Sequence, residues 1–94
     1  MREDIYFCLD LTESEHEIIS SELSEVCATN GLELVYYRKL KEGHIPMIRE
    51  IKVRFHGKRP IFFRFMSDKN LWNHAKRWEN GKLTNWVPYT GTSF

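Results

Sequence analysis

Two neighbouring segments in which apolar and polar side chains alternate constrain this fold more than any other feature of the sequence. In MIREIKVRFH, residues 47–56, apolar residues alternate with cationic ones, which is the period of a half-buried β-strand. After a turn at Gly57-Lys58, the alternation of PIFFRFM, residues 60–66, predicts another strand. Such a short connection joins antiparallel strands. The sequence therefore predicts an antiparallel sheet with one apolar face.

Two earlier segments extend this sheet. DIYFCLD, residues 4–10, and LELVYYRKL, residues 32–40, are rich in residues that favour strands. KEGHIP, residues 41–46, contains Gly43 and Pro46 and predicts a polar turn. Residues 32–66 are therefore expected to form a three-stranded meander, with the strand at residues 4–10 as a fourth candidate.

Two helices are predicted from capping signals and apolar spacing. Thr12 and Glu15 have the spacing of a capping box, so a helix is expected over residues 13–29, ended by Asn30-Gly31. Ser67 predicts the start of a second helix over residues 67–79, ended by Asn80-Gly81. The tail KLTNWVPYTGTSF could form one more short strand, interrupted at Pro88.

These elements predict one domain, residues 1–94, of the α+β class. The expected order is β-α-β-β-β-α, with an antiparallel sheet of three to four strands and both helices on one face. The predicted inner face carries the apolar side chains of the two alternating segments, namely Ile51, Val53, Phe55, Ile61, Phe63 and Phe65.

The net charge of +1 conceals a strong segregation of charge along the chain. Residues 1–30 contain eight acidic residues against Arg2 alone, and residues 31–94 contain thirteen Lys and Arg against five acidic residues. Segregation of this kind indicates surfaces that attract partners of opposite charge. The alternative is that the two halves face each other and neutralise one another within the fold.

The solvent face of the predicted sheet carries cations and an aromatic ring, which predicts binding of an anionic partner. Single-stranded nucleic acid or RNA is the first expectation, with cations on phosphates and Phe62 stacking on a base. Strand register decides whether Tyr36 and Arg38 or Tyr37 and Lys39 join this face. The candidate binding residues are Lys39, Lys52, Arg54, His56, Lys58, Arg59, Phe62, Arg64, Lys76 and Arg77.

The stretches GHIP and IKVRFHGK, together with the predicted order helix, three-stranded meander, helix, resemble double-stranded-RNA-binding modules and HicA-type toxin ribonucleases. The resemblance covers roughly residues 12–79 and implies an RNA partner. The chain departs from that pattern by its N-terminal strand, and it has SDKN at residues 67–70 where those modules have a lysine-rich helix start.

The second expectation is a small inhibitor, immunity-type or anti-defence protein that blocks a partner enzyme or complex. The predicted helix 13–29 has five glutamates and no Lys or Arg, so it could occupy a basic groove of a partner. Alternatively, the basic face could bind an acidic protein. Oppositely charged faces of two copies could also pair as a homodimer.

No sequence motif predicts catalysis, a cofactor or a metal site. The four histidines have no metal-ligand spacing, and His44, in the predicted turn, is the single candidate for a general base. Cys8 and Cys27 are expected to be reduced and structural in the cytoplasm. No apolar run is long enough to span a membrane.

Overall fold

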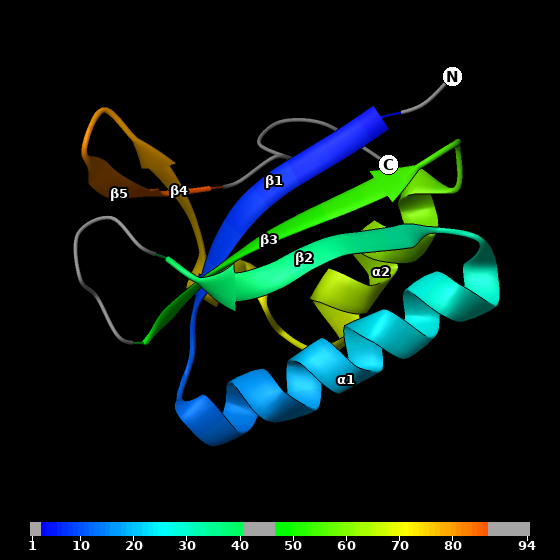
Figure 1. The fold of residues 1–94 in the computed structure, drawn as a ribbon, viewed down its shortest axis with the longest axis horizontal. Coiled ribbons are helices and arrows are strands. Elements are labelled where there is room, and N and C mark those ends of the chain that lie inside the picture. Colours follow the sequence, from blue (N-terminus) through cyan, green and yellow to red (C-terminus); the bar gives the residue numbers. More distant parts are fainter. Residues whose placement is uncertain (1–2, 41–46, 87–94) are drawn as a thin grey trace.

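The computed structural model describes residues 3–40 and 47–86. Its elements follow the order β-α-β-β-α-β-β, with a short 3₁₀ helix before the fourth strand (Figure 1). They are β1 (Glu3–Asp10), α1 (Glu13–Asn30), β2 (Glu33–Lys39), β3 (Ile48–Phe55), α2 (Arg59–Asp68), η2 (Trp72–His74), β4 (Ala75–Glu79) and β5 (Lys82–Asn85).

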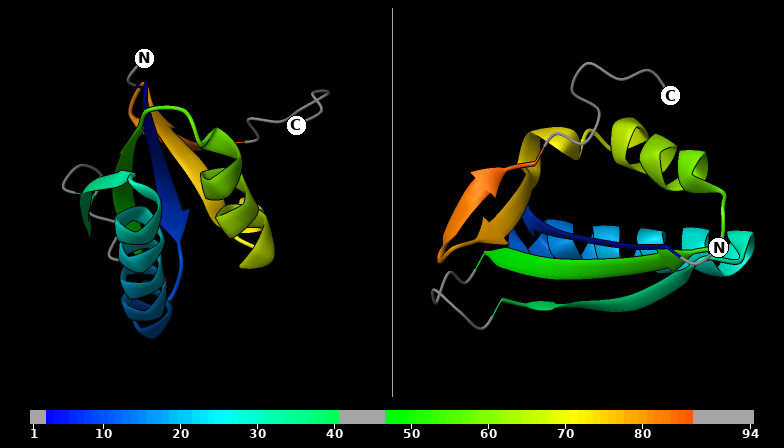
Figure 2. Two further views of the ribbon diagram at one scale, coloured as in Figure 1. Left: turned by 90° about the vertical axis from the view of Figure 1, so that its right-hand side faces the viewer. Right: turned by 90° about the horizontal axis from the view of Figure 1, so that it is seen from above.

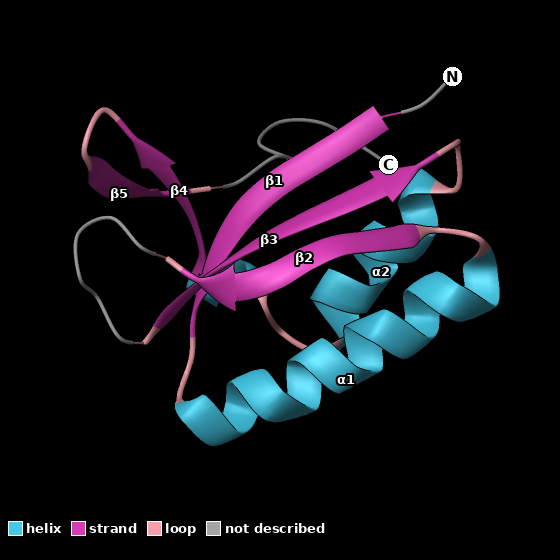
Figure 3. Ribbon diagram, viewed as in Figure 1, coloured by secondary structure: helices cyan, strands magenta, loops and turns pink. Residues whose placement is uncertain are grey.

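The five strands form one antiparallel sheet in the order β2-β3-β1-β4-β5 (Figure 3). β1 is the central strand, and it pairs along its whole length with β3, from Glu3 opposite Phe55 to Asp10 opposite Ile48. A bulge between Leu34 and Tyr36 shifts the register of β2 on β3. β2 and β5 are left as the two edges of the described sheet.

One face of the sheet carries the core, and both helices pack against it (Figure 2). Phe7 of β1 and Phe55 of β3 are fully buried there, together with Leu23 of α1 and Phe62 of α2. The predicted alternation of residues 47–56 is confirmed, because Ile51, Val53 and Phe55 are buried. We call the opposite surface of the sheet the outer face.

The helix predicted over residues 13–29 is confirmed as α1. The Thr12 hydroxyl accepts a hydrogen bond from the Glu15 amide at 3.2 Å, and the Glu15 carboxylate accepts one from the Thr12 amide at 2.9 Å. These bonds satisfy amides that a helix start otherwise leaves unpaired. At the other end Gly31 adopts φ 71°, and its amide donates to the Cys27 carbonyl.

The strand predicted over residues 60–66 is wrong, because these residues lie in α2. Pro60 lies in the first turn of the helix, where its fixed φ is favourable and its missing amide hydrogen has no intrahelical acceptor. Phe62 and Met66, four residues apart, are both fully buried. An apolar run of this kind satisfies either period, and the helix buries more of it than an alternating strand would.

The helix predicted over residues 67–79 is also wrong. Ser67 and Asp68 end α2 rather than begin a helix, and the chain continues through η2 into β4. Asn80 and Gly81 adopt φ of 52° and 76° between Glu79 and Lys82, which pair directly. Two positive φ values in a two-residue connection are the requirement of the tight hairpin turn that Asn-Gly favours.

The predicted α+β class with two helices and an antiparallel sheet is confirmed, and the short strand predicted in the tail is present as β5. The three-stranded meander between two helices is corrected to the two strands β2 and β3. The turn predicted at residues 41–46, with its candidate base His44, lies outside the described residues.

Candidate functional site

The cations predicted to bind a partner on the outer face are paired with carboxylates of the same face. Arg54 lies directly opposite Asp4 of β1 and Glu33 of β2. Its Nε is 2.9 Å from Asp4 Oδ1, and its Nη1 is 3.7 Å from Glu33 Oε1. Lys52 Nζ is 3.8 Å from the other Asp4 oxygen. The hydrogen bond to Asp4, together with the charges of Asp4 and Glu33, raises the pKa of Arg54. All three contacts offset the positive charge of the face.

A second network occupies the outer face around Glu50 of β3. Its carboxylate accepts hydrogen bonds from the Tyr6 hydroxyl at 3.0 Å and from Arg38 Nε at 2.7 Å. The Arg38 guanidinium lies 3.8 Å from the centre of the Tyr36 ring. The register of β2 therefore places Tyr36 and Arg38 on this face, and it directs Tyr37 toward α1.

Cys8 lies beside this network, and its thiol is a poor nucleophile. The side chain is fully buried, and Sγ is 3.6 Å from the Tyr6 hydroxyl. Burial raises the pKa of the Cys8 thiol and also raises that of Tyr6. Thiolates rather than thiols attack electrophiles. Cys8 and Cys27 are both free and buried, as predicted.

The ten predicted binding residues do not form one surface. Phe62 is fully buried among Phe7, Phe55 and Phe63 rather than placed on the outer face. That correction removes the ring on which base stacking was expected. The others are distributed as follows: Lys52 and Arg54 on the outer face, Lys39 at the end of β2, His56 and Lys58 in the β3–α2 turn, Arg59 and Arg64 on α2, and Lys76 and Arg77 on β4.

Much of the segregated charge is neutralised within the fold. Arg49 pairs with Glu13, Arg59 pairs with Glu3 at 3.1 Å, and Lys69 pairs with Glu22 at 3.0 Å. Each pair joins an acid of the first thirty residues to a cation of the remainder. The alternative in which the two halves face each other therefore accounts for part of the charge pattern.

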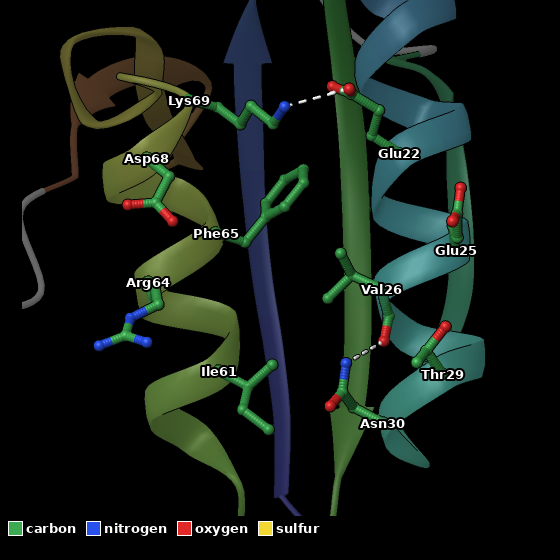
Figure 4. Close-up of a pocket in the computed structure, with 10 residues that line it drawn as sticks. All are labelled: Glu22, Glu25, Val26, Thr29, Asn30, Ile61, Arg64, Phe65, Asp68 and Lys69. Carbon is green, nitrogen blue, oxygen red and sulfur yellow. Dashed lines mark hydrogen bonds and ion pairs between the residues drawn. The ribbon is translucent and has the colours of Figure 1, made fainter.

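A groove lies between α1 and α2, and we call it the interhelical groove (Figure 4). It encloses about 490 Å³. Figure 4 shows Val26, Ile61 and Phe65 between the helices, where they form an apolar floor. The charged or polar side chains that line the rest are Glu22, Glu25, Thr29, Asn30, Arg64, Asp68 and Lys69.

Two side-chain contacts tie the helices together at the ends of this groove. Lys69 Nζ contacts Glu22 Oε2 at one end, and Lys58 Nζ donates to the Asn30 carbonyl at 3.0 Å at the other. The end of α2 therefore lies beside the middle of α1, and its beginning beside the end of α1. The two helices run antiparallel on the sheet.

A smaller hollow of about 230 Å³ continues along α1 beyond Lys69. Leu11, Ile19 and Leu71 contribute its buried apolar lining, and Ile18 lies at its edge with 58% of its surface exposed. Lys69 lines both hollows. Sequence reasoning missed both, because it placed no helix at residues 59–68.

A buried polar cluster fixes α1 on the sheet. The side chain of His16 is buried, with Nδ1 2.6 Å from the Tyr37 hydroxyl and Nε2 2.8 Å from the Met47 carbonyl oxygen. A carbonyl oxygen only accepts, so Nε2–H donates to Met47 and Nδ1 accepts from Tyr37. Burial lowers the pKa of His16, and the nearby Arg49 lowers it further.

The described residues contain no group of three or more His, Cys, Asp or Glu arranged to hold a metal ion. Within the same residues, no helix has the length and apolar character needed to cross a bilayer. Comparison with protein-family models, curated proteins and solved structures found no match to this chain.

Proposed function

We propose that this chain is a small, non-catalytic binding protein that blocks a partner enzyme or complex by covering a basic protein surface with α1. The observation that carries the proposal is the interhelical groove, whose apolar floor lies beside a helix without a single cation. On α1, Glu17 and Glu25 are exposed and have no ion pair in the described residues. Ile18 adds an exposed apolar side chain between the acids.

This arrangement suits a protein partner because it combines apolar contact with an unneutralised charge of one sign. Interfaces gain most of their affinity from buried apolar anchors, while peripheral charges steer the encounter and select the partner. Free, buried Cys8 and Cys27 suit a reducing compartment such as the cytoplasm.

The test is affinity purification of the tagged chain from its native host, without added nuclease. The double variant Glu17→Lys/Glu25→Lys reverses charge on α1, and Glu79→Lys is the matched control because Glu79 is exposed at the end of β4. We expect wild type and the control to retain a stoichiometric protein that the double variant loses. A protein retained equally by all three would contradict the proposal.

Nucleic-acid binding is a second candidate, and the β4–β5 hairpin is the observation that favours it. Lys76, Arg77 and Lys82 have no ion pair in the described residues, and the Arg77 guanidinium lies 5.2 Å from the centre of the Trp86 ring. The same purification tests this candidate through the ratio of absorbance at 260 and 280 nm. A nucleic-acid spectrum that Lys76→Glu/Lys82→Glu abolishes would support it over the protein partner.

A further inference from the structure

We propose that the interhelical groove binds a basic amphipathic helix of a partner protein. In the free protein the Lys69 side chain lies across this groove as a bar, and the partner displaces it on binding. The inference rests on the proposed function and deepens it, because it specifies which part of a partner is recognised and where. It also assigns a role to the contact between Lys69 and Glu22.

The shape of the groove follows from the two helices that form its walls. Glu22, Val26 and Asn30 recur every four residues along α1, and Ile61, Phe65 and Lys69 do so along α2. A third helix presents apolar side chains at the same spacing, so its stripe can lie along the floor. The groove and the smaller hollow together follow α1 from Glu15 to Asn30, which is about 22 Å at 1.5 Å per residue.

The charge of the walls selects a basic occupant. The α1 wall carries carboxylates and no cation, and Glu25 is exposed without an ion pair in the part of the chain described. The α2 wall carries one positive and one negative side chain, Arg64 and Asp68, whose charges cancel. Figure 4 shows both on the side of α2 that is turned away from α1. A partner helix with Lys or Arg on the side facing α1 therefore meets complementary charge.

Lys69 supplies the cation that a partner would replace. Its ammonium is 3.0 Å from Glu22 Oε2, so its side chain extends from α2 to α1 (Figure 4). The same side chain lines both hollows. The two side chains of this pair are about two-fifths exposed, at 38% and 40%, and exposed pairs of this kind contribute little to stability. A cation of the partner can therefore replace Lys69 in the ion pair with the Glu22 carboxylate. The Lys69 side chain then turns to solvent, and the two hollows join into one groove.

The probe is a 14-residue peptide with leucines at positions 1, 4, 8 and 11, lysines beside them and alanines elsewhere. A twin peptide has glutamates in place of the lysines. Titration into the full chain labelled at Ile and Val methyl groups should shift Ile18, Val26 and Ile61 saturably with the lysine peptide alone. Binding of the glutamate peptide to the same methyls would overturn the proposal, as would shifts confined to residues of β3.

The role of Lys69 gives a directional test. Lys69→Met keeps the aliphatic stem and removes the charge, so affinity for the lysine peptide should rise about twofold to fivefold. Lys82→Met, an exposed cation of β5, is the matched control and should leave the affinity unchanged. Weaker binding by Lys69→Met would show that Lys69 attracts the occupant, which contradicts its assignment as a bar.

The floor variants Val26→Thr and Ile61→Thr separate failure of this inference from failure of the proposed function. Both keep a branched side chain, and each should weaken the lysine peptide roughly fivefold by removing apolar contact. If Glu17→Lys/Glu25→Lys abolishes capture of the native partner while the floor variants bind peptide and partner like wild type, α1 is the binding surface and the groove inference is wrong. If the double variant has no effect on the partner either, the proposed function is wrong as well.

Discussion

At the scale of single residues, His16 makes stability depend on pH. Burial lowers its pKa in the folded protein, and Arg49 lowers it further, against the opposing effects of the hydrogen bond to Met47 and of Glu13 and Asp10. The unfolded value is about 6.5. At pH values between the folded and the unfolded pKa of His16, the imidazole is protonated in more of the unfolded chains than of the folded ones. The stabilisation is therefore complete above pH 6.5 and is lost as pH falls below it.

We expect the free energy of unfolding of wild type, measured with urea from pH 5 to 8, to fall below pH 6.5 with a slope approaching about 1.4 kcal/mol per pH unit. His16→Gln can retain a donor and an acceptor but cannot titrate, so its profile should be flatter over this range. His56→Gln, at an exposed position, is the control and should follow wild type. Parallel profiles for wild type and His16→Gln would contradict this account.

Phe62, which the sequence predicts on the outer face, lies in the core of the structure. Its ring is fully buried and lies 5.5 Å from Phe7 and 5.4 Å from Phe63, measured between ring centres. Phe62→Ala should therefore lower the free energy of unfolding by about 3–5 kcal/mol. Arg64→Ala, at an exposed position on the same helix, should change it by less than about 0.5 kcal/mol. Equal, small effects would place Phe62 at the surface.

At the scale of elements, the sequence predicts the helices and strands that are marked by local capping residues or by a regular alternation of apolar and polar side chains. The Thr12–Glu15 box and Gly31 define α1, and the alternation of residues 48–55 defines β3. Residues 59–68 could not be assigned in this way, because four buried apolar residues within five positions satisfy a strand or a helix. The long-range contact of Phe62 with Phe7 decides between them, and no local pattern contains it.

The β4–β5 hairpin was predictable, but Asn80-Gly81 was interpreted as the end of a helix. Asn-Gly favours both a helix terminus and a hairpin turn, and the alternating residues on either side distinguish the two. The interhelical groove could not be predicted at all, since it depends on where α2 lies. The acidic surface of α1, in contrast, follows directly from the sequence.

The hairpin turn itself gives a prediction. Gly81 has φ of 76°, which is unfavourable for residues with a side chain, so Gly81→Val should lower the free energy of unfolding by about 1–2 kcal/mol. Thr84→Val, at an exposed position in β5, is the control and should be close to neutral. Thermal unfolding followed by circular dichroism measures the stability of both variants. An unchanged midpoint for Gly81→Val would show that residue 81 does not have a positive φ.

At the scale of the whole molecule, the two sides of the sheet differ in what they leave for a partner. On the outer face, Arg54 and Lys52 are paired with Asp4, and Arg38 with Glu50. The helical side instead has the interhelical groove and the carboxylates of Glu17 and Glu25, which have no ion pair among residues 3–40 and 47–86. Binding is therefore expected on the helical side, with an affinity that falls as salt screens the exposed acids.

Hydrogen–deuterium exchange of the full chain, alone and bound to the protein captured from its native host, tests the central claim most directly. We expect slower exchange in residues 15–30 and 59–69, which form the two walls, and unchanged exchange in β2 and β3. Protection confined to β2 and β3, with α1 and α2 unchanged, would place the partner on the outer face and contradict the account.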